Sequence, residues 1–115
     1  MHLKSSVMQR ARFLNKAKVI EKLSKLAAKA KAKDKNIKKI ILFGSLTDNT
    51  YTALSDADLL IILEKSELRF IDRIPEFIFY FLDAPVSVDV FPYTEEEVKK
   101  VKLAKNAISK GSLLA

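Results

Sequence analysis

Apolar residues recur along the first third of the chain at the spacing of a helix. From Phe13 to Ala30 they step by three or four places, which lays them along one stripe of a helix. The lysines of this segment mostly fall off that stripe. The pattern predicts one long basic helix over about residues 6–33, whose apolar stripe consists of Phe13, Ala17, Ile20, Leu23, Ala27 and Ala30.

Three later segments have the character of strands. Residues 37–43 are rich in β-branched and apolar side chains and end at a glycine. Residues 58–63 are apolar on both faces, which favours a central strand. Residues 86–91 alternate, so that three valines share one face and Asp89 lies on the other. Pro92 is predicted to end this third strand.

Helices are predicted between and after these strands. Residues 66–82 have a helical pattern, in which Pro75 must break or kink the helix. Thr94 and Glu97 match a capping box at the start of a last helix that runs to a glycine after about residue 110. With a short helix after the first strand, the order is α-β-α-β-α-β-α. We expect one α/β domain over residues 1–115, with helices flanking a small sheet of about three strands.

The residue types that are missing exclude several classes of chemistry. The chain has 115 residues, no cysteine and a single histidine, His2. Disulfide scaffolds and cysteine-type metal or redox sites are therefore excluded, and the absence of cysteine fits a reducing cytoplasm. The longest uncharged apolar run, residues 77–82, is too short to span a bilayer. No signal peptide is visible at the N-terminus, so we expect a cytoplasmic protein that does not enter a membrane.

Positive charge is concentrated in the first third of the chain. Residues 1–39 carry 13 Lys and Arg against two acidic residues, whereas residues 40–115 carry 8 against 12. A basic segment of this kind can be a solvated helix face, a nucleic-acid footprint or a surface for an acidic partner. The charge distribution alone leaves all three interpretations open.

The chemistry of the chain centres on two short motifs. Gly44-Ser45 follows the first strand, and after ten further residues Asp56 and Asp58 open the second strand. Carboxylates two places apart on an extended segment point to the same side. Their mutual repulsion favours a cation between them, and hard oxygen ligands suit Mg²⁺ together with substrate phosphates. Gly44 lets the backbone approach a phosphate, and a helix opening at Ser45 offers free N–H groups to it.

A third carboxylate completes this constellation. Asp89 lies in the middle of a strand, opposite the face of the three valines. Beside the other two it would form a three-carboxylate, two-metal site for phosphoryl or nucleotidyl transfer. Taken singly, each motif also has an ordinary structural interpretation, as a turn former, a helix cap or an edge-strand carboxylate facing water. Their co-occurrence in the right strand and loop context favours the chemical interpretation.

The sequence at these positions resembles a known family. The segments Leu42-Phe43-Gly44-Ser45 and Ser55-Asp56-Ala57-Asp58-Leu59, with ten residues between Ser45 and Asp56, are similar to the GSx10DxD signature of minimal nucleotidyltransferases in the DNA polymerase β-like superfamily. The resemblance implies a mixed sheet flanked by helices, Mg²⁺-dependent binding of a nucleoside triphosphate, and attack on its α-phosphate with release of pyrophosphate. Antitoxin-type members transfer AMP from ATP to a tyrosine hydroxyl of a partner toxin with a HEPN domain.

The same resemblance implies roles for individual residues. Asp56 and Asp58 would hold two magnesium ions, Asp89 would bind the catalytic ion and help deprotonate the incoming hydroxyl, and Gly44 and Ser45 would hold the triphosphate. Many members continue with Arg-Ala-Arg-Gly, where this chain has Leu46-Thr47-Asp48-Asn49. The lost arginines weaken the attraction for a polyanion. The alternative to an enzyme is therefore a binding module that neutralises a partner protein, or a nucleic-acid-binding domain that uses the basic helix.

Residues 77–82 predict a further surface. The segment Phe77-Ile78-Phe79-Tyr80-Phe81-Leu82 is apolar all round a helix, so one core contact does not cover every side chain. Either it is sandwiched between the sheet and the N-terminal helix, or part of it faces a partner or a second copy of the chain.

Overall fold

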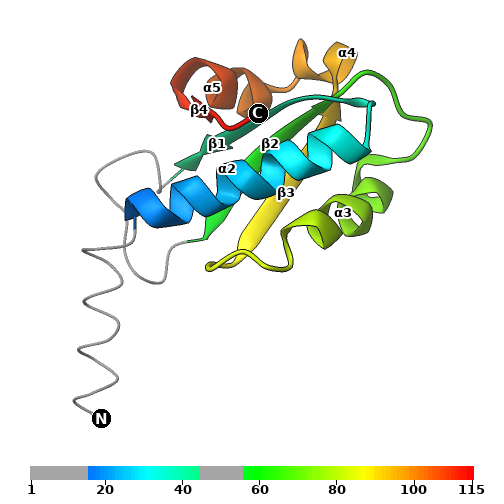
Figure 1. Cartoon of the computed structure of the whole chain (residues 1–115). Helices are drawn as coiled ribbons and strands as arrows, with labels where there is room; N and C mark the ends of the chain where they lie inside the picture. Colours follow the sequence, from blue (N-terminus) through cyan, green and yellow to red (C-terminus); the bar gives the residue numbers. More distant parts are fainter. Residues whose placement is uncertain (1–15, 45–55) are drawn as a thin grey trace.

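The described helices and strands follow the predicted order, except that the last helix is split and a short fourth strand comes after it. A computed structural model of the chain describes residues 16–44 and 56–115, and Figure 1 shows their arrangement. The predicted short helix at Ser45 and the part of the basic helix before residue 16 lie outside the described residues. The elements are α2 (Lys16–Lys33), β1 (Ile37–Phe43), β2 (Ala57–Leu63), α3 (Phe70–Ile78), the 3₁₀ helix η2 (Phe79–Phe81), β3 (Val88–Thr94), α4 (Glu95–Val98), α5 (Lys102–Lys110) and β4 (Ser112–Leu113).

The sheet is mixed, and its strands lie in the order β3-β2-β1-β4. β1 is antiparallel to both β2 and β4, and β2 is parallel to β3. The prediction that the second strand is central is confirmed, and its apolar side chains are buried on both faces. The sheet has four strands rather than about three. The additional strand, β4, is only two residues long, which is too short for any hydrophobic pattern to show.

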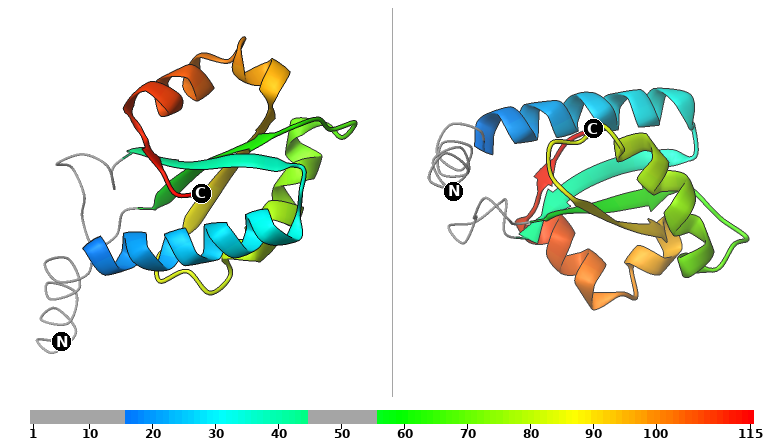
Figure 2. Two further views of the ribbon diagram at one scale, coloured as in Figure 1. Left: turned by 45° about the horizontal axis from the view of Figure 1, so that its top comes forward. Right: turned by 90° about the horizontal axis from the view of Figure 1, so that it is seen from below.

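Helices cover both faces of the sheet and form three layers (Figure 2). On one face, buried residues of α2 and η2 pack with Leu59, Ile61 and Val90. On the other face, Ala104 and Ala107 of α5 pack with Ile41, Leu60 and Ile62. Because successive side chains of a strand alternate between the faces, every second residue of β2 faces α5.

The apolar stripe of the basic helix is only partly as predicted. The described part of the helix buries Leu23, Ala27 and Ala30, and Ile20 packs against the same core. Ala17 is exposed, so its prediction is wrong. The buried set instead includes Val19 and Leu26. Because both lie one position away from predicted stripe residues, the stripe is wider and slightly rotated, as expected for a helix that lies across a sheet.

Pro75 does not break the third helix. The segment predicted over residues 66–82 begins later, at Phe70, and α3 continues through Pro75 to Ile78. A proline leaves the carbonyl four residues earlier without its helical donor. That carbonyl belongs to Ile71, whose exposed fraction is 65%, so water can satisfy it. The exposed position makes the proline tolerable.

The aromatic segment divides between the core and the surface. Phe77 and Phe81 are buried, whereas Phe79 and Leu82 are exposed at 71% and 67%. Burial against the sheet and α2 therefore accounts for only half of the segment.

The third strand is displaced toward its C-terminus. It was predicted over residues 86–91 and runs from Val88 to Thr94, so Pro92 lies inside it. The carbonyl of Pro92 accepts a hydrogen bond from Arg73 at 3.0 Å and thus points away from β2. The N–H that proline lacks would lie on the same outer edge, where no ladder bond is needed.

The predicted capping box is present, but the last helix is split. The hydroxyl of Thr94 accepts from the N–H of Glu97, and the carboxylate of Glu97 accepts from the N–H of Thr94. Only the four residues of α4 follow this cap, and α5 begins after Val101, which has an extended backbone. Gly111 ends α5 as predicted. A Cβ there would approach the carbonyl oxygens of Ala107 and Leu42 to 2.5 and 2.6 Å, so the chain can pass close to β1 only with glycine.

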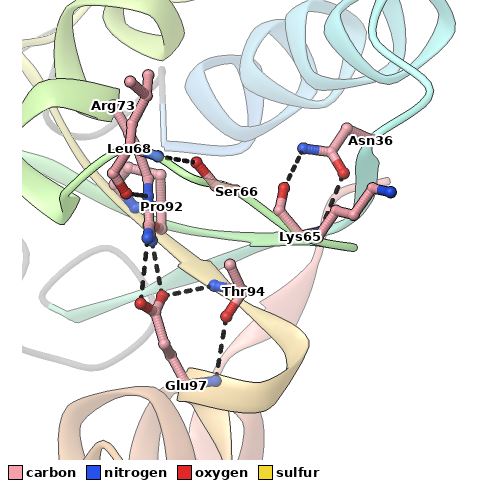
Figure 3. Close-up of polar contacts among 8 residues, drawn as sticks. All are labelled: Asn36, Lys65, Ser66, Leu68, Arg73, Pro92, Thr94 and Glu97. Carbon is pink, nitrogen blue, oxygen red and sulfur yellow. Dashed lines mark hydrogen bonds and ion pairs between the residues drawn. The ribbon is translucent and has the colours of Figure 1, made fainter.

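A buried ion pair joins α3, β3 and α4 (Figure 3). The guanidinium of Arg73, which is 4% exposed, donates to both carboxylate oxygens of Glu97 at 2.6 and 3.1 Å and to the carbonyls of Leu68 and Pro92. The pKa of Glu97 is lowered from 4.5 to about 2, chiefly by the hydrogen bond from Arg73 and also by the N–H of Thr94, against the opposing effect of burial.

This pair predicts a specific loss of stability in acid. Because the pKa of Glu97 is lower in the folded than in the unfolded state, its contribution is present above about pH 4.5 and disappears as the pH falls toward 2. With a discount for the 39% exposure of Glu97, we expect a loss of roughly 1–2 kcal/mol. Urea unfolding from pH 7 to pH 3 should show a steeper decline for the natural chain than for Glu97→Gln; parallel declines would contradict this.

Candidate nucleotide site

Two carboxylates face each other across neighbouring strands. Asp58 of β2 lies opposite Asp89 of β3 in the parallel pairing. Asp58 lies two places before Leu60 and Asp89 two places before Phe91, and both of those side chains belong to the core under α5. By alternation, the two carboxylates are therefore on the face that α5 covers.

The first strand extends this row. Phe43 is the antiparallel partner of Asp58, and Phe43, Asp58 and Asp89 thus lie side by side across three strands. The rings of Phe43 and Phe91 pack at a centroid distance of 5.4 Å, although β2 lies between their strands. This aromatic pair bridges over β2 next to the carboxylates and separates them from the core.

Asp58 is in an unfavourable environment for a negative charge. Its pKa is raised, first by burial and then by the charges of Asp89 and Asp56. These are the effects expected where carboxylates share a site without a cation. Asp56 is exposed and precedes the first residue of β2, Ala57. The strand alternation that was expected to align it with Asp58 therefore does not extend to it.

Gly44 is required beside Asp58 for two reasons. Its φ of +85° lies in the region that glycine adopts without strain. In addition, an added Cβ would meet the carboxylate of Asp58, with its Cγ at 3.3 Å. Any side chain at position 44 would therefore displace the carboxylate. Ser45, the predicted partner of Gly44 in phosphate binding, lies outside the described residues.

The oxygen ligands present suit a hard divalent cation, but they do not form a complete coordination shell. In residues 16–44 and 56–115, no group of three or more His, Cys, Asp or Glu is arranged to hold a metal ion. The paired carboxylates of Asp58 and Asp89, with Asp56 nearby, offer the oxygen ligands that Mg²⁺ prefers. Mg²⁺ commonly takes its remaining ligands from substrate phosphates and water. The residues present thus fit an ion that arrives with a phosphate ligand.

A groove of about 710 Å³ opens next to Gly44. One wall is Phe43 and Gly44 at the end of β1, and the other is a face of α5. Sequence reasoning missed this second wall. Its signal was the spacing of Lys102, Asn106 and Lys110, which recur every fourth residue and so share one side of a helix.

Comparison with known proteins gives the family. The model of the nucleotidyltransferase domain matches residues 12–113. The chain belongs to the nucleotidyltransferase domain family. A proposed nucleotidyltransferase from Sulfolobus solfataricus, solved at 1.40 Å, superposes with a TM-score of 0.66 over 86% of this chain and 81% of that one, at 19% identity. The nucleotidyltransferase fold predicted from sequence is thereby confirmed. A search of curated proteins finds no match.

Family membership indicates nucleotidyl transfer as the general chemistry of this nucleotidyltransferase domain. The roles predicted for Asp56, Asp58, Asp89, Gly44 and Ser45 remain predictions. Among the described helices, none combines the length and apolar character needed to cross a bilayer.

Proposed function

We propose that the chain is a Mg²⁺-dependent nucleotidyltransferase that transfers AMP from ATP to a hydroxyl group. The observation that carries this proposal is the pair of carboxylates on adjacent strands, Asp58 and Asp89, beside a glycine that keeps the space in front of Asp58 open. The pKa of Asp58 is raised by burial first and then by the unbalanced negative charges of Asp89 and Asp56. A bound cation relieves such charge and at the same time attracts a polyphosphate.

The reaction requires few changes of bonding. The oxygen of the acceptor hydroxyl forms a bond to the α-phosphorus, and the bond from this phosphorus to the bridging oxygen of the β-phosphate breaks. The electron pair of that bond leaves with pyrophosphate. Asp89 accepts the hydroxyl proton and thereby strengthens the nucleophile. Asp56, Asp58 and Asp89 would hold the magnesium, which supplies neutralisation of the phosphate charge.

Gly44 and Ser45 are proposed to hold the triphosphate. The positive φ of Gly44 turns the chain at the end of β1, and the absence of a side chain lets a phosphate approach the backbone. A bulkier residue would occupy the same space as the Asp58 carboxylate. The turn at Gly44 and the position of the Asp58 carboxylate are therefore compatible only while residue 44 has no side chain.

The proposed acceptor is a hydroxyl of a HEPN-domain toxin, with this chain as its antitoxin. The support for it is the resemblance of the Gly-Ser and Asp-x-Asp motifs to antitoxin-type minimal nucleotidyltransferases. With ATP labelled on the α-phosphate, label should appear on the partner protein. A complex that forms without transfer of label would instead make the chain a binding module.

The metal assignment predicts ligand-dependent stability. Mg²⁺ with ATP at about 100 times Kd should stabilise the fold by about 2.7 kcal/mol, or roughly 10 °C in Tm. Asp58→Asn should abolish this shift. Because the raised pKa of Asp58 means that its ionised form opposes folding, the variant should melt at the same or a higher temperature without metal.

The control for this melt is Glu67→Gln, which removes one charge from an exposed position after β2. It should retain the full shift with Mg²⁺ and ATP. Coincident melts of the natural chain with and without Mg²⁺ and ATP would contradict the metal site.

A further inference from the structure

Two lysines of α5 face the groove beside Gly44. Lys102 and Lys110 line it together with Asn106, which lies between them on the same side of the helix. The opposite wall is Phe43 and Gly44. The groove thus has two ammonium groups and an amide on one side, and the turn that follows β1 on the other.

These lysines are on the same face of the sheet as the carboxylates. α5 covers the face on which Ile41 and Leu60 are buried, and Asp58 lies two places before Leu60 on that face. Phe43 connects the groove with the carboxylates, because it lines the groove and is the strand partner of Asp58. A ligand in the groove therefore lies next to the proposed magnesium ligands.

The lysines of the groove are available for an external anion. In the part of the chain that the structure describes, neither Lys102 nor Lys110 forms an ion pair, whereas Lys25, Lys38 and Lys100 each pair with a glutamate. Residues 40–115 carry more acidic than basic groups. Two unpaired lysines on one wall of a groove are thus a local departure from the charge of the body.

We propose that Lys102 and Lys110, with Asn106, bind the phosphate chain of the nucleoside triphosphate. A polyphosphate carries several negative charges along a short extended chain, and ammonium groups bind such charges as point contacts. Lys102 and Lys110 are two helical turns apart, about 12 Å along the axis of α5. They therefore contact different parts of an extended triphosphate chain. This inference rests on the proposed function and assigns α5 a part in substrate binding.

The arrangement also separates two functions by charge: the carboxylates are proposed to bind the metal, and the lysines of α5 the phosphates. The carboxylates of Asp58 and Asp89, which lie beside the groove, repel a bare phosphate, whereas α5 supplies positive charge along one wall of the groove. Binding of the phosphates by α5 then does not require the metal to be present first. Inorganic tripolyphosphate, without nucleoside or metal, is therefore the direct probe of this wall.

The test compares three variants of α5 by isothermal titration with sodium tripolyphosphate in EDTA at low salt. Lys102→Gln and Lys110→Gln should each weaken binding about tenfold, and the double variant by more. Lys105→Gln removes the same charge from an exposed position of the helix that does not line the groove, and should change affinity less than twofold. The circular dichroism spectra of all variants should coincide.

Two results would overturn the inference: equal weakening by Lys105→Gln and Lys102→Gln, or no measurable binding of tripolyphosphate by the natural chain. With Mg²⁺ and ATP, the two groove variants should raise KM about tenfold and leave kcat within threefold. Failure of the proposed function is a separate outcome, because a chain that binds tripolyphosphate through Lys102 and Lys110 but transfers no label retains this site.

Discussion

Replacing Asp89 by Asn should lower the rate of nucleotidyl transfer by about 10³-fold. The variant cannot accept the proton of the attacking hydroxyl, and it loses one of the oxygen ligands proposed for magnesium. Its fold should persist, because the side chain of Asp89 is exposed and makes no hydrogen bond or ion pair among the described residues. The measurement is single-turnover transfer of label from ATP labelled on the α-phosphate, with the HEPN partner as acceptor.

Two comparisons make this result interpretable. Asp58→Asn should lower the rate by a similar factor and also lose the thermal shift with Mg²⁺ and ATP, because Asp58 is the more buried carboxylate of the pair. Glu67→Gln, which changes one charge far from this row along the chain, should transfer label at the natural rate. Retention of activity within tenfold by Asp89→Asn would remove this residue from the reaction.

The largest loss of stability should come from Glu97→Ala. The substitution leaves the Arg73 guanidinium buried with only two carbonyls to bind and also removes half of the capping box. A buried charge without its partner costs about 3–5 kcal/mol, and urea unfolding at pH 7 should show a loss near the lower end of this range, because Glu97 itself is 39% exposed.

The control for this prediction is a second ion pair, which is exposed on the surface. Glu21 and Lys25 are about two-thirds exposed on α2, so Glu21→Ala should cost less than about 0.5 kcal/mol. Arg73→Ala and the double variant with Glu97→Ala complete a cycle whose coupling energy we expect to be about 1.5–3 kcal/mol. A coupling energy near zero would show that the buried pair adds no more than the surface pair.

The sequence allowed those features to be predicted that depend on the alternation of side chains along one segment. The two apolar faces of β2 indicated its central position. The valines opposite Asp89 indicated the face of that carboxylate, and Asp58 faces the same side because both residues occupy equivalent positions in parallel strands. The GSx10DxD pattern indicated a nucleotidyltransferase, and the comparisons confirm that broader domain family.

Features that depend on contacts between distant segments could not be predicted from the alternation of side chains. Pro92 is accommodated inside β3 because its carbonyl is turned toward Arg73, nineteen residues earlier. Asp56 precedes the first residue of β2, so the strand pairing that places Asp58 opposite Asp89 does not include it. The groove wall on α5 exists only because that helix packs over the end of β1. Neither the contact of Pro92 with Arg73 nor the packing of α5 on β1 leaves a periodic trace, although the groove-lining residues of α5 recur every fourth place.

Both margins of the described sheet have features that hinder the addition of a further strand. On the β1 side, Ser112–Leu113 forms β4, and the next residues continue with hydrogen bonds to Ile40. On the β3 side, Pro92 has no N–H to offer, and its carbonyl is already bound by Arg73. Proteins that recognise a sheet by adding a strand need a free row of donors and acceptors. The short β4 and the proline in β3 therefore disfavour recognition by strand addition, and the same features limit edge-to-edge aggregation.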